Sequence, residues 1–405
     1  MTDDFLRRYA ELAIRVGANL APGQDLYVTG PVEHAPLMRA VAEAGWRAGA
    51  RNVELVYADD YEASLRARHA ADDVLEESPR ARLGVARSML DSDPAEVLVW
   101  GDATPEIWEG VDEARAARVR RPRELVDLIT RQVNEGRVAW TIIGCPSEGW
   151  ARRMFGEPDV ARLVRAVAAA VRLDEPDPVA AWQRHLDRLE ERARLLDERR
   201  FDAIHFRGPG TDLTVGLLAD ARWKTALAEA RTGRRHAVNL PTEEVFTTPD
   251  LRRTSGRATS TRPMSVYGVL LERVELAFTD GCAELVGADA GAEFVREQLA
   301  ADEGAPFLGE VALVDGTTPL ARSGHLFYDI LYDENIASHI AYGQGYTRPV
   351  PGSEALPRDE QRARGINQSD VHIDLPIGGA DVEVAGLDAS GRATRILDGD
   401  DWVLD

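Results

Sequence analysis

The sequence predicts two parts of different fold class: an N-terminal α/β domain with a mostly parallel, open sheet, and a C-terminal α+β domain that is largely antiparallel. The chain has 405 residues, more than a single hydrophobic core usually serves. Its first third alternates apolar strands with helical stretches. The second half instead has short strands joined by brief connections that carry Gly or Asp-Gly.

The N-terminal elements follow from apolar periodicity. Helices are predicted at 3–18, 35–49, 79–90 and 113–134, and strands at 25–29, 52–57, 96–100 and 137–143. The first two strands flank a helix, and a connection of that length makes them parallel. No G-x-G-x-x-G or Walker-type lysine motif follows any of these strands, which disfavours a nucleotide site.

A charged helical stretch at 158–200 separates the two parts. Its arginines and carboxylates are interleaved, which is typical of a solvated helix face. We place the boundary inside it, giving a doubly wound scaffold or interface domain over 1–190 and a metal-binding catalytic domain over 191–405.

The C-terminal elements are mainly short strands. Strands at 201–207 and 212–218 are expected to form a hairpin through Gly208-Pro209-Gly210. Further strands are predicted at 266–271, 273–279, 282–286, 310–314, 371–376 and 381–384, and helices at 290–301 and 335–341.

Composition limits the classes of partner. The net charge of −21 and the pI of about 4.9 argue against nucleic acid or an anionic membrane surface as the main partner. Cys145 and Cys282 fit no zinc or redox spacing, which favours a reducing compartment. No apolar run is long enough for a membrane span, and the acidic start MTDDF is unlike a signal peptide. We therefore expect a soluble cytoplasmic protein. Lys224 is the only lysine, so a Schiff base has one candidate.

The stretch FYDILYDENIASHIAYGQGY (327–346) brings together Glu334, His339 and Tyr346. A carboxylate, an imidazole and a phenol suit a hydrolytic metal site. The alternative is a helix N-terminus whose acidic residues complement the dipole. For a site, we expect Glu334 in a loop or first turn and His339 inside the following helix. Gly343 and Gly345 then let Tyr346 return to the same cavity.

His372 and Asp374 are separated by one residue on an apolar strand, so both point to the same face. The alternative is an exposed edge strand. Glu310 begins the apolar run EVALV, and Glu244 lies in NLPTEEVFTTPD between two prolines. In an extended segment Glu243 and Glu244 point to opposite sides.

Together these residues balance two divalent cations in charge. The set comprises four carboxylates and two imidazoles: Glu244, Glu310, Glu334, Asp374, His339 and His372. With one bridging carboxylate they would hold two metals roughly 3.5–4 Å apart. The other histidines are weaker candidates: we expect solvated side chains at His34, His69 and His185, and at most outer positions for His205, His236 and His325. No G-x-S-x-G or H-E-x-x-H motif occurs.

Five segments, in order, resemble the thermophilic aminopeptidase family of dinuclear metallopeptidases. They are NLPTEEVFTTP (239–249), STRPMSVYG (260–268), FLGEVALV (307–314), LFYDILYDENIASHIAYGQGY (326–346) and NQSDVHIDLPIG (367–378). The resemblance implies an N-terminal α/β domain, a C-terminal catalytic domain and a homodimer that encloses the active sites. It places the metal ligands on the same six residues and the active-site tyrosine on Tyr346. Zinc or cobalt is the implied metal, with manganese or magnesium as alternatives.

The expected function is an aminopeptidase that acts on peptides with a free N-terminus. Two metals would activate water, Tyr346 would stabilise the oxyanion, and Glu243 would shuttle the proton. Three alternatives stay open: a dinuclear phosphoesterase that uses Arg262 or Arg348 as a clamp, a non-catalytic binding protein, and an inactive member of the fold.

Overall fold

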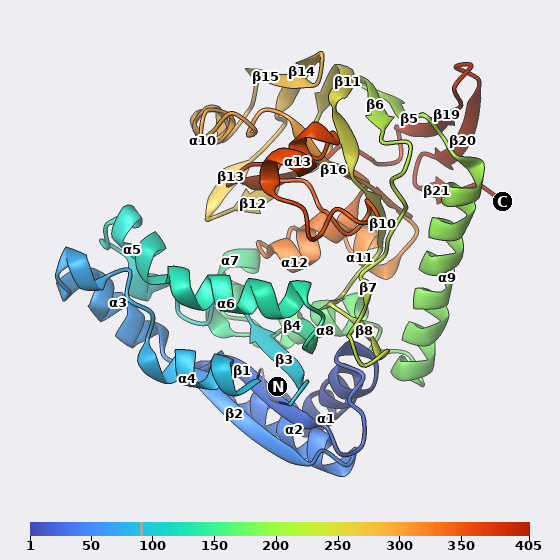
Figure 1. Cartoon of the computed structure of the whole chain (residues 1–405). Helices are drawn as coiled ribbons and strands as arrows, with labels where there is room; N and C mark the ends of the chain where they lie inside the picture. The colour runs from blue at the N-terminus through green and yellow to red at the C-terminus, as the bar shows by residue number, and fades with distance from the viewer. Residues whose placement is uncertain (90–91, 121) are drawn as a thin grey trace. The chain divides into compact units, whose positions relative to one another are not determined.

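The structure is a computed structural model that describes residues 1–89, 92–120 and 122–405 (Figure 1). Residues 90 and 121, which fall in or beside two predicted helices, lie outside the described residues. The chain separates into two compact units, Met1–Gln183 with Leu227–Leu240, and Arg184–Ala226 with Pro241–Asp405. The functional division at residue 190 stays a prediction. Within the described residues, every helix is too short or too polar to cross a membrane.

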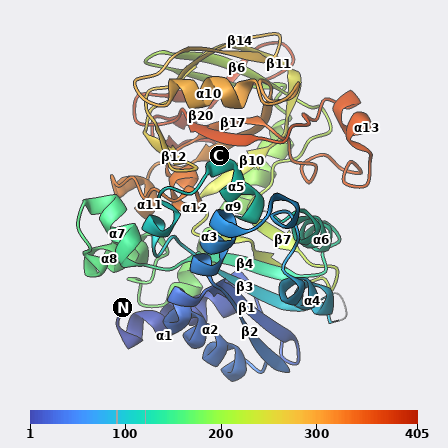
Figure 2. The same cartoon turned by 90° about the vertical axis from the view of Figure 1, so that its left-hand side faces the viewer.

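The first unit contains a five-stranded sheet in the order β2-β1-β3-β4-β9, and all of its pairs are parallel (Figure 2). Its strands are β1 (Asp25–Pro31), β2 (Asn52–Ala58), β3 (Ala95–Trp100), β4 (Ala139–Gly144) and β9 (Asn239–Leu240). A small antiparallel pair, β7 (Leu227–Glu229) and β8 (Arg235–Ala237), completes the strands. The predicted parallel sheet is confirmed.

Helices cover both faces of this sheet. Leu26 on β1 contacts Gly45 of α2, whereas Tyr27, which points the opposite way, packs with Met89 and with Val85 of α4. The helices are α1 (Asp3–Leu12), α2 (Ala35–Arg47), α3 (Asp60–His69), α4 (Arg80–Ser88), α5 (Glu113–Arg120), α6 (Arg123–Asn134), α7 (Glu148–Phe155) and α8 (Val160–Ala170). Helix α9 (Pro178–Arg199) contains the point at which the second unit begins.

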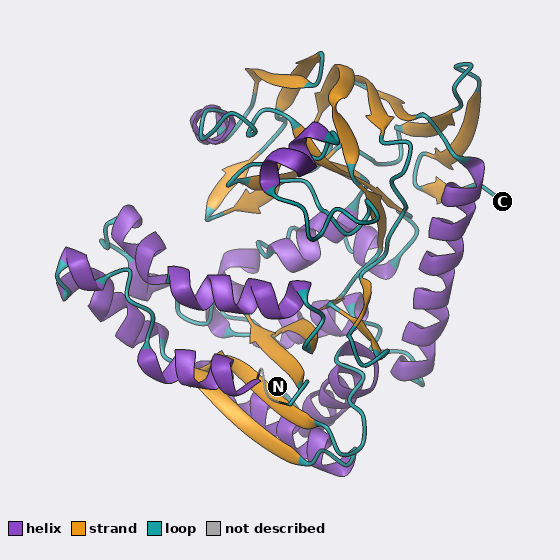
Figure 3. Ribbon diagram, in the orientation of Figure 1, coloured by secondary structure: helices purple, strands orange, loops and turns teal. Residues whose placement is uncertain are grey.

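The second unit is mainly antiparallel β-structure (Figure 3). An eight-stranded sheet has the order β15-β14-β11-β6-β5-β19-β20-β21. These strands are β5 (Ala203–Gly208), β6 (Thr211–Leu217), β11 (Pro249–Thr259), β14 (Glu275–Thr279), β15 (Cys282–Gly287), β19 (Glu383–Leu387), β20 (Ala393–Asp398) and β21 (Asp401–Trp402). The predicted β5–β6 hairpin is confirmed.

A four-stranded sheet in the order β10-β16-β17-β18 forms the other layer of the same core. Its strands are β10 (Glu244–Thr247), β16 (Leu308–Val314), β17 (His339–Gly343) and β18 (His372–Pro376). The remaining elements are the pair β12 (Met264–Val266) and β13 (Val269–Leu271) and the helices α10 (Ala292–Leu299), α11 (Pro319–Arg322), α12 (Ile330–Asp333) and α13 (Arg358–Ala363).

Two of the elements predicted in the second unit are wrong. The helix expected at 335–341 is absent, because the segment passes from a 3-10 turn (Glu334–Ile336) into strand β17. Pairing of β17 with strands on both sides fixes its extended backbone, so tertiary structure overrides local propensity. The single strand expected at 266–271 is instead a hairpin, which turns at Tyr267 and Gly268 with positive φ at both.

Gly343, at the end of β17, has a φ of +101°, and a Cβ there would overlap the carbonyl oxygen of Val371. We therefore expect Gly343→Ala to lower the free energy of unfolding by roughly 2–5 kcal/mol, from backbone strain plus steric overlap. Urea unfolding measures this change. The matched control is Gly324→Ala, which has φ +66° but no atom within 4 Å of the added Cβ, so only about 1–2 kcal/mol should be lost. Equal losses in the two variants would contradict the overlap.

Candidate metal centre

The four-stranded sheet has one apolar and one polar face, because successive side chains on a strand alternate. The apolar face supplies Val245, Val311, Leu313, Ile340, Ile373 and Leu375 to the hydrophobic core. The opposite face carries five of the six predicted metal ligands: Glu244 on β10, Glu310 on β16, His339 on β17, and His372 and Asp374 on β18. The antiparallel register therefore brings together residues that lie up to 130 positions apart in the chain.

Small residues separate these ligands on the polar face. Ala341 pairs with Glu310 on one side and with Asp374 on the other. Ala312 pairs with His339, and Gly343 pairs with His372. A larger side chain at these positions would fill the space above the sheet, so the small residues leave room for ions and substrate.

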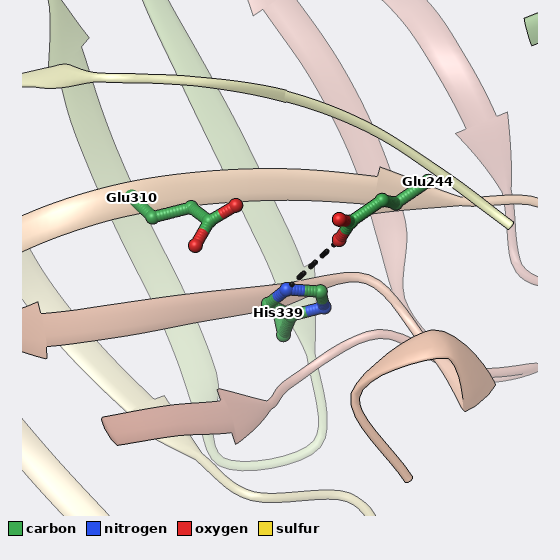
Figure 4. A group of neighbouring side chains, drawn as sticks. All are labelled: Glu244, Glu310 and His339. Carbon is green, nitrogen blue, oxygen red and sulfur yellow. Dashed lines mark ion pairs between the residues drawn. The ribbon is translucent and has the colours of Figure 1, made fainter. Parts of the chain in front are cut away.

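The ligand atoms form two overlapping groups. Glu244, Glu310 and His339 make one group (Figure 4), and Glu310, His372 and Asp374 make the other. Within each group the ligand atoms lie within 4.8 Å of one another. Glu310 belongs to both. A carboxylate has two oxygens, so Glu310 has an acceptor to offer to each group.

Both histidines are oriented as metal-binding imidazoles are. Nδ1 of His339 donates to the carbonyl of Ala337 at 3.1 Å, and Nδ1 of His372 donates to the carbonyl of Gln344 at 2.8 Å. Because a carbonyl can only accept, Nδ1 keeps its proton, and loss of the proton on Nε2 would leave the lone pair of that nitrogen directed at the carboxylates. Sequence patterns could not identify the carbonyl of Gln344, since a backbone acceptor has no side-chain signature.

The donor set fits divalent cations. Nε2 of His339 is 3.2 Å from Oε2 of Glu244, yet this buried oxygen accepts no hydrogen bond. Nε2 of His372 lies 3.3 Å from Glu310 and 3.4 Å from Asp374. Nitrogen and oxygen lone pairs that converge in this way suit a divalent cation.

The pKa values of the side chains on the polar face also favour a divalent cation. Burial raises the pKa of Glu310 to about 7, and the negative charge of Glu244 adds to this rise. Burial lowers the pKa of His339, but its contact with Glu244 and the charge of Asp374 outweigh this and raise the pKa to about 10. The Glu310 carboxyl and the His339 imidazole thus hold protons that a divalent cation would displace.

Glu334 lies in the 3-10 turn rather than on the sheet. It belongs to neither of the two ligand groups, and burial and the charges of Asp374 and Glu244 raise its pKa well above the usual value. The side-chain amide of Asn335 donates to Glu334 at 3.3 Å, and its oxygen accepts the backbone N–H of Glu243 at 2.8 Å. Asn335 is fully buried and joins two segments of the site, a role that sequence analysis missed.

Tyr346 reaches the polar face from the segment after β17. Its hydroxyl is 3.4 Å from Nε2 of His372, and its ring packs edge-on against Phe246 with centroids 5.4 Å apart. Tyr346 as a whole is 41% exposed, but desolvation of its hydroxyl by the surrounding protein and the charge of Glu310 raise its pKa well above the usual value. The phenol is therefore a neutral hydrogen-bond donor.

Glu243 is fully buried, and its carboxylate lies 3.1 Å from Nε2 of His185. The same nitrogen is 2.8 Å from the carbonyl of Thr242. The prediction of a solvated His185 is wrong, because the helix face that carries it is covered and the ring is 1% exposed. His34 is likewise buried, with Nε2 bonded to the carbonyl of Gly101 at 2.9 Å, whereas His69 is exposed as predicted.

The remaining histidines lie outside the two ligand groups. His205 pairs with Asp212 at 2.8 Å, His236 bonds the backbone of Trp140 and His325 packs against Phe327. Asp333, which precedes Glu334, accepts the backbone N–H of Phe327 at 2.7 Å and stabilises a turn instead.

Comparison with known proteins agrees with this geometry. Residues 2–402 match the family model described as thermophilic metalloprotease (M29). Aminopeptidase T of Thermus thermophilus is 40% identical over 98% of both chains, and aminopeptidase 2 of Geobacillus stearothermophilus is 32% identical over 99% of this chain and 98% of its own. The solved structure of wild-type AmpT from Thermus thermophilus superposes with a TM-score of 0.90 at 37% identity and covers 98% of this chain and 99% of its own. The chain therefore belongs to the thermophilic metalloprotease (M29) family.

Proposed function

We propose that this protein uses the polar face of the four-stranded sheet to hold two divalent cations and to hydrolyse the first peptide bond of peptides with a free N-terminus. As a family member with aminopeptidases as full-length relatives, the chain is a metal-dependent aminopeptidase. The observation that carries the dinuclear proposal is the position of Glu310, which both ligand groups share.

The six proposed ligands are Glu244, Glu310, Glu334, His339, His372 and Asp374. Bound there, divalent cations would lower the pKa of a water molecule and polarise the scissile carbonyl. The free α-amine of a peptide would contact one of these cations or one of the carboxylates. This contact requires a free N-terminus and so explains exopeptidase action.

Two further residues act on the reacting groups in this proposal. Tyr346, held neutral by its surroundings, donates a hydrogen bond to the oxyanion that develops on the scissile carbonyl. Glu243 carries the proton from water to the leaving amine. Its support is its position next to Glu244 and its full burial, with His185 fixing the carboxylate.

The same proposal includes the identity of the ions, the cellular location and the oligomeric state. The ions are zinc or cobalt, with manganese or magnesium as alternatives, because imidazole and carboxylate donors suit all four to different degrees. Both cysteines are free, which supports a reducing, cytoplasmic location. We also propose a homodimer on the basis of the family resemblance, and light scattering of the eluted protein tests it: a monomer mass would remove this part.

The expected assay result is release of nitroaniline from an aminoacyl p-nitroanilide by the purified protein. Chelation should abolish this activity, and zinc or cobalt should restore it, with about two ions per chain at full activity. The matched control substrate is the same anilide with an acetylated amine, which should not react because it lacks the ammonium group. Activity that is indifferent to chelation, or rapid cleavage of the acetylated substrate, would contradict the proposed function.

A further inference from the structure

We propose that Lys224, assisted by Arg348, forms a cationic subsite at the edge of the polar face, and that this subsite binds the C-terminal carboxylate of short peptide substrates. The inference rests on the proposed aminopeptidase function and adds a substrate class to it: dipeptides and tripeptides rather than long chains. Three observations support it: the backbone pairing at the edge of β10, the positive charges of Lys224 and Arg348, and the absence of a close partner for the lysine among the described residues.

Backbone pairing places Lys224 on the polar face. It forms an antiparallel bridge with Phe246, with N–H···O distances of 2.8 and 2.9 Å in the two directions. Residues directly opposite each other in such a pair project to the same face. Phe246 lies two positions after Glu244 on β10 and contacts Tyr346, so this face is the one that carries the proposed ligands.

The neighbour of Lys224 in the chain supports this direction independently. Trp223 belongs to the hydrophobic core on the other side of the sheet. Because successive side chains of an extended segment alternate, Lys224 must point away from that core. The lysine side chain is half-buried, not an open surface side chain.

The distance suits a short peptide. Two residues along a strand span roughly 7 Å, and a hydrogen-bonded antiparallel pair separates Cα atoms by about 5.5 Å. A peptide bound in extended form advances roughly 3.4 Å per residue. The carboxylate of a dipeptide or tripeptide would reach Phe246 and Lys224 if its first peptide bond lay above Glu244 and Glu310 and its chain followed β10.

The charges leave a role for an anion. Throughout the described residues, no hydrogen bond or ion pair involves the ammonium group of Lys224, and Asp197 and Glu354 act on it only at longer range. Burial and the charge of Arg348 lower the pKa of Lys224. Arg348 is itself buried enough for its pKa to be lowered despite the charge of Glu354, and it donates to the carbonyl of Thr225 at 3.0 Å. A bound carboxylate would accept a charge-assisted hydrogen bond from Lys224, next to this second cation.

The test compares kcat/KM for dipeptides and tripeptides with kcat/KM for their C-terminal amides, which lack the anion. We expect the protein to prefer the free acid by roughly 10- to 100-fold, the strength of a charge-assisted hydrogen bond. In Lys224→Met the acid-to-amide ratio should fall close to one, whereas Lys224→Arg should keep most of it. Arg207→Met, which removes an exposed cation from β5, is the matched control and should leave the ratio unchanged.

Hydrolysis of an aminoacyl p-nitroanilide serves as the internal reference, since that substrate has no carboxylate. If the unmodified protein cleaves the anilide but treats acid and amide alike, the subsite is wrong while the aminopeptidase function stands. A preference that survives in Lys224→Met also overturns it. If the anilide is not cleaved at all, the proposed function fails and this inference with it. Should Lys224→Met not fold, Lys224→Gln makes the same comparison.

Discussion

Replacing Glu310 with Gln is expected to remove most of the bound metal and to lower kcat/KM on an aminoacyl anilide by about 1,000-fold or more, because metal-ion catalysis contributes several kcal/mol. Glu310 is the one residue shared by the two ligand groups. An amide keeps the shape of the side chain but carries no charge and has a single acceptor oxygen, so it cannot bridge two ions. Metal analysis after gel filtration and steady-state kinetics measure the two losses.

The matched control for this variant is Glu284→Gln, which removes an exposed carboxylate from β15 in the same unit. It should retain both metal and rate. If Glu310→Gln also retained two ions and full activity, Glu310 would not bridge them and the dinuclear proposal would be wrong. Loss of a single ion with partial activity would place Glu310 on one ion only.

The parallel and antiparallel halves of the fold were predictable because hydrophobic patterns report strand and helix periods directly. The pair His372 and Asp374 is the clearest site example. A two-residue period places both side chains on one face, and the apolar Ile373 and Leu375 between and after them identify the opposite face as core. Nothing in that pattern states which other strands lie alongside, so the convergence with Glu244 and Glu310 required the register.

His339 shows where local reasoning fails. A helix was predicted from Asn335 to Ala341, although only Ala337 and Ala341 in that run are strong helix formers. In the structure, His339 begins a strand that pairs with a neighbouring strand on each side. Because side chains alternate along a strand, the His339 side chain lies on the polar face. The charged sequence around His185 likewise predicted solvent exposure, but packing covers that side of the helix. Both errors concern long-range contacts, which a local pattern does not contain.

Replacing Tyr346 with Phe should lower kcat on the anilide by roughly 100- to 1,000-fold while leaving KM and metal content close to unchanged. The hydroxyl is the group removed, and the ring keeps its edge-on packing against Phe246. An interaction made only in the transition state appears in kcat and not in KM, because the ground-state carbonyl does not need the donor. Steady-state kinetics with parallel metal analysis separates these quantities.

Tyr267→Phe is the matched control, since that tyrosine is 70% exposed in the same unit and should keep full activity. A fully active Tyr346→Phe would remove the tyrosine from the mechanism. If Tyr346→Phe lost metal together with rate, the hydroxyl would be supporting the ligand His372 rather than the oxyanion. The distance of 3.4 Å between the hydroxyl and Nε2 of His372 allows such a role. The ratio of metal lost to rate lost therefore decides between a catalytic donor and a positioning residue.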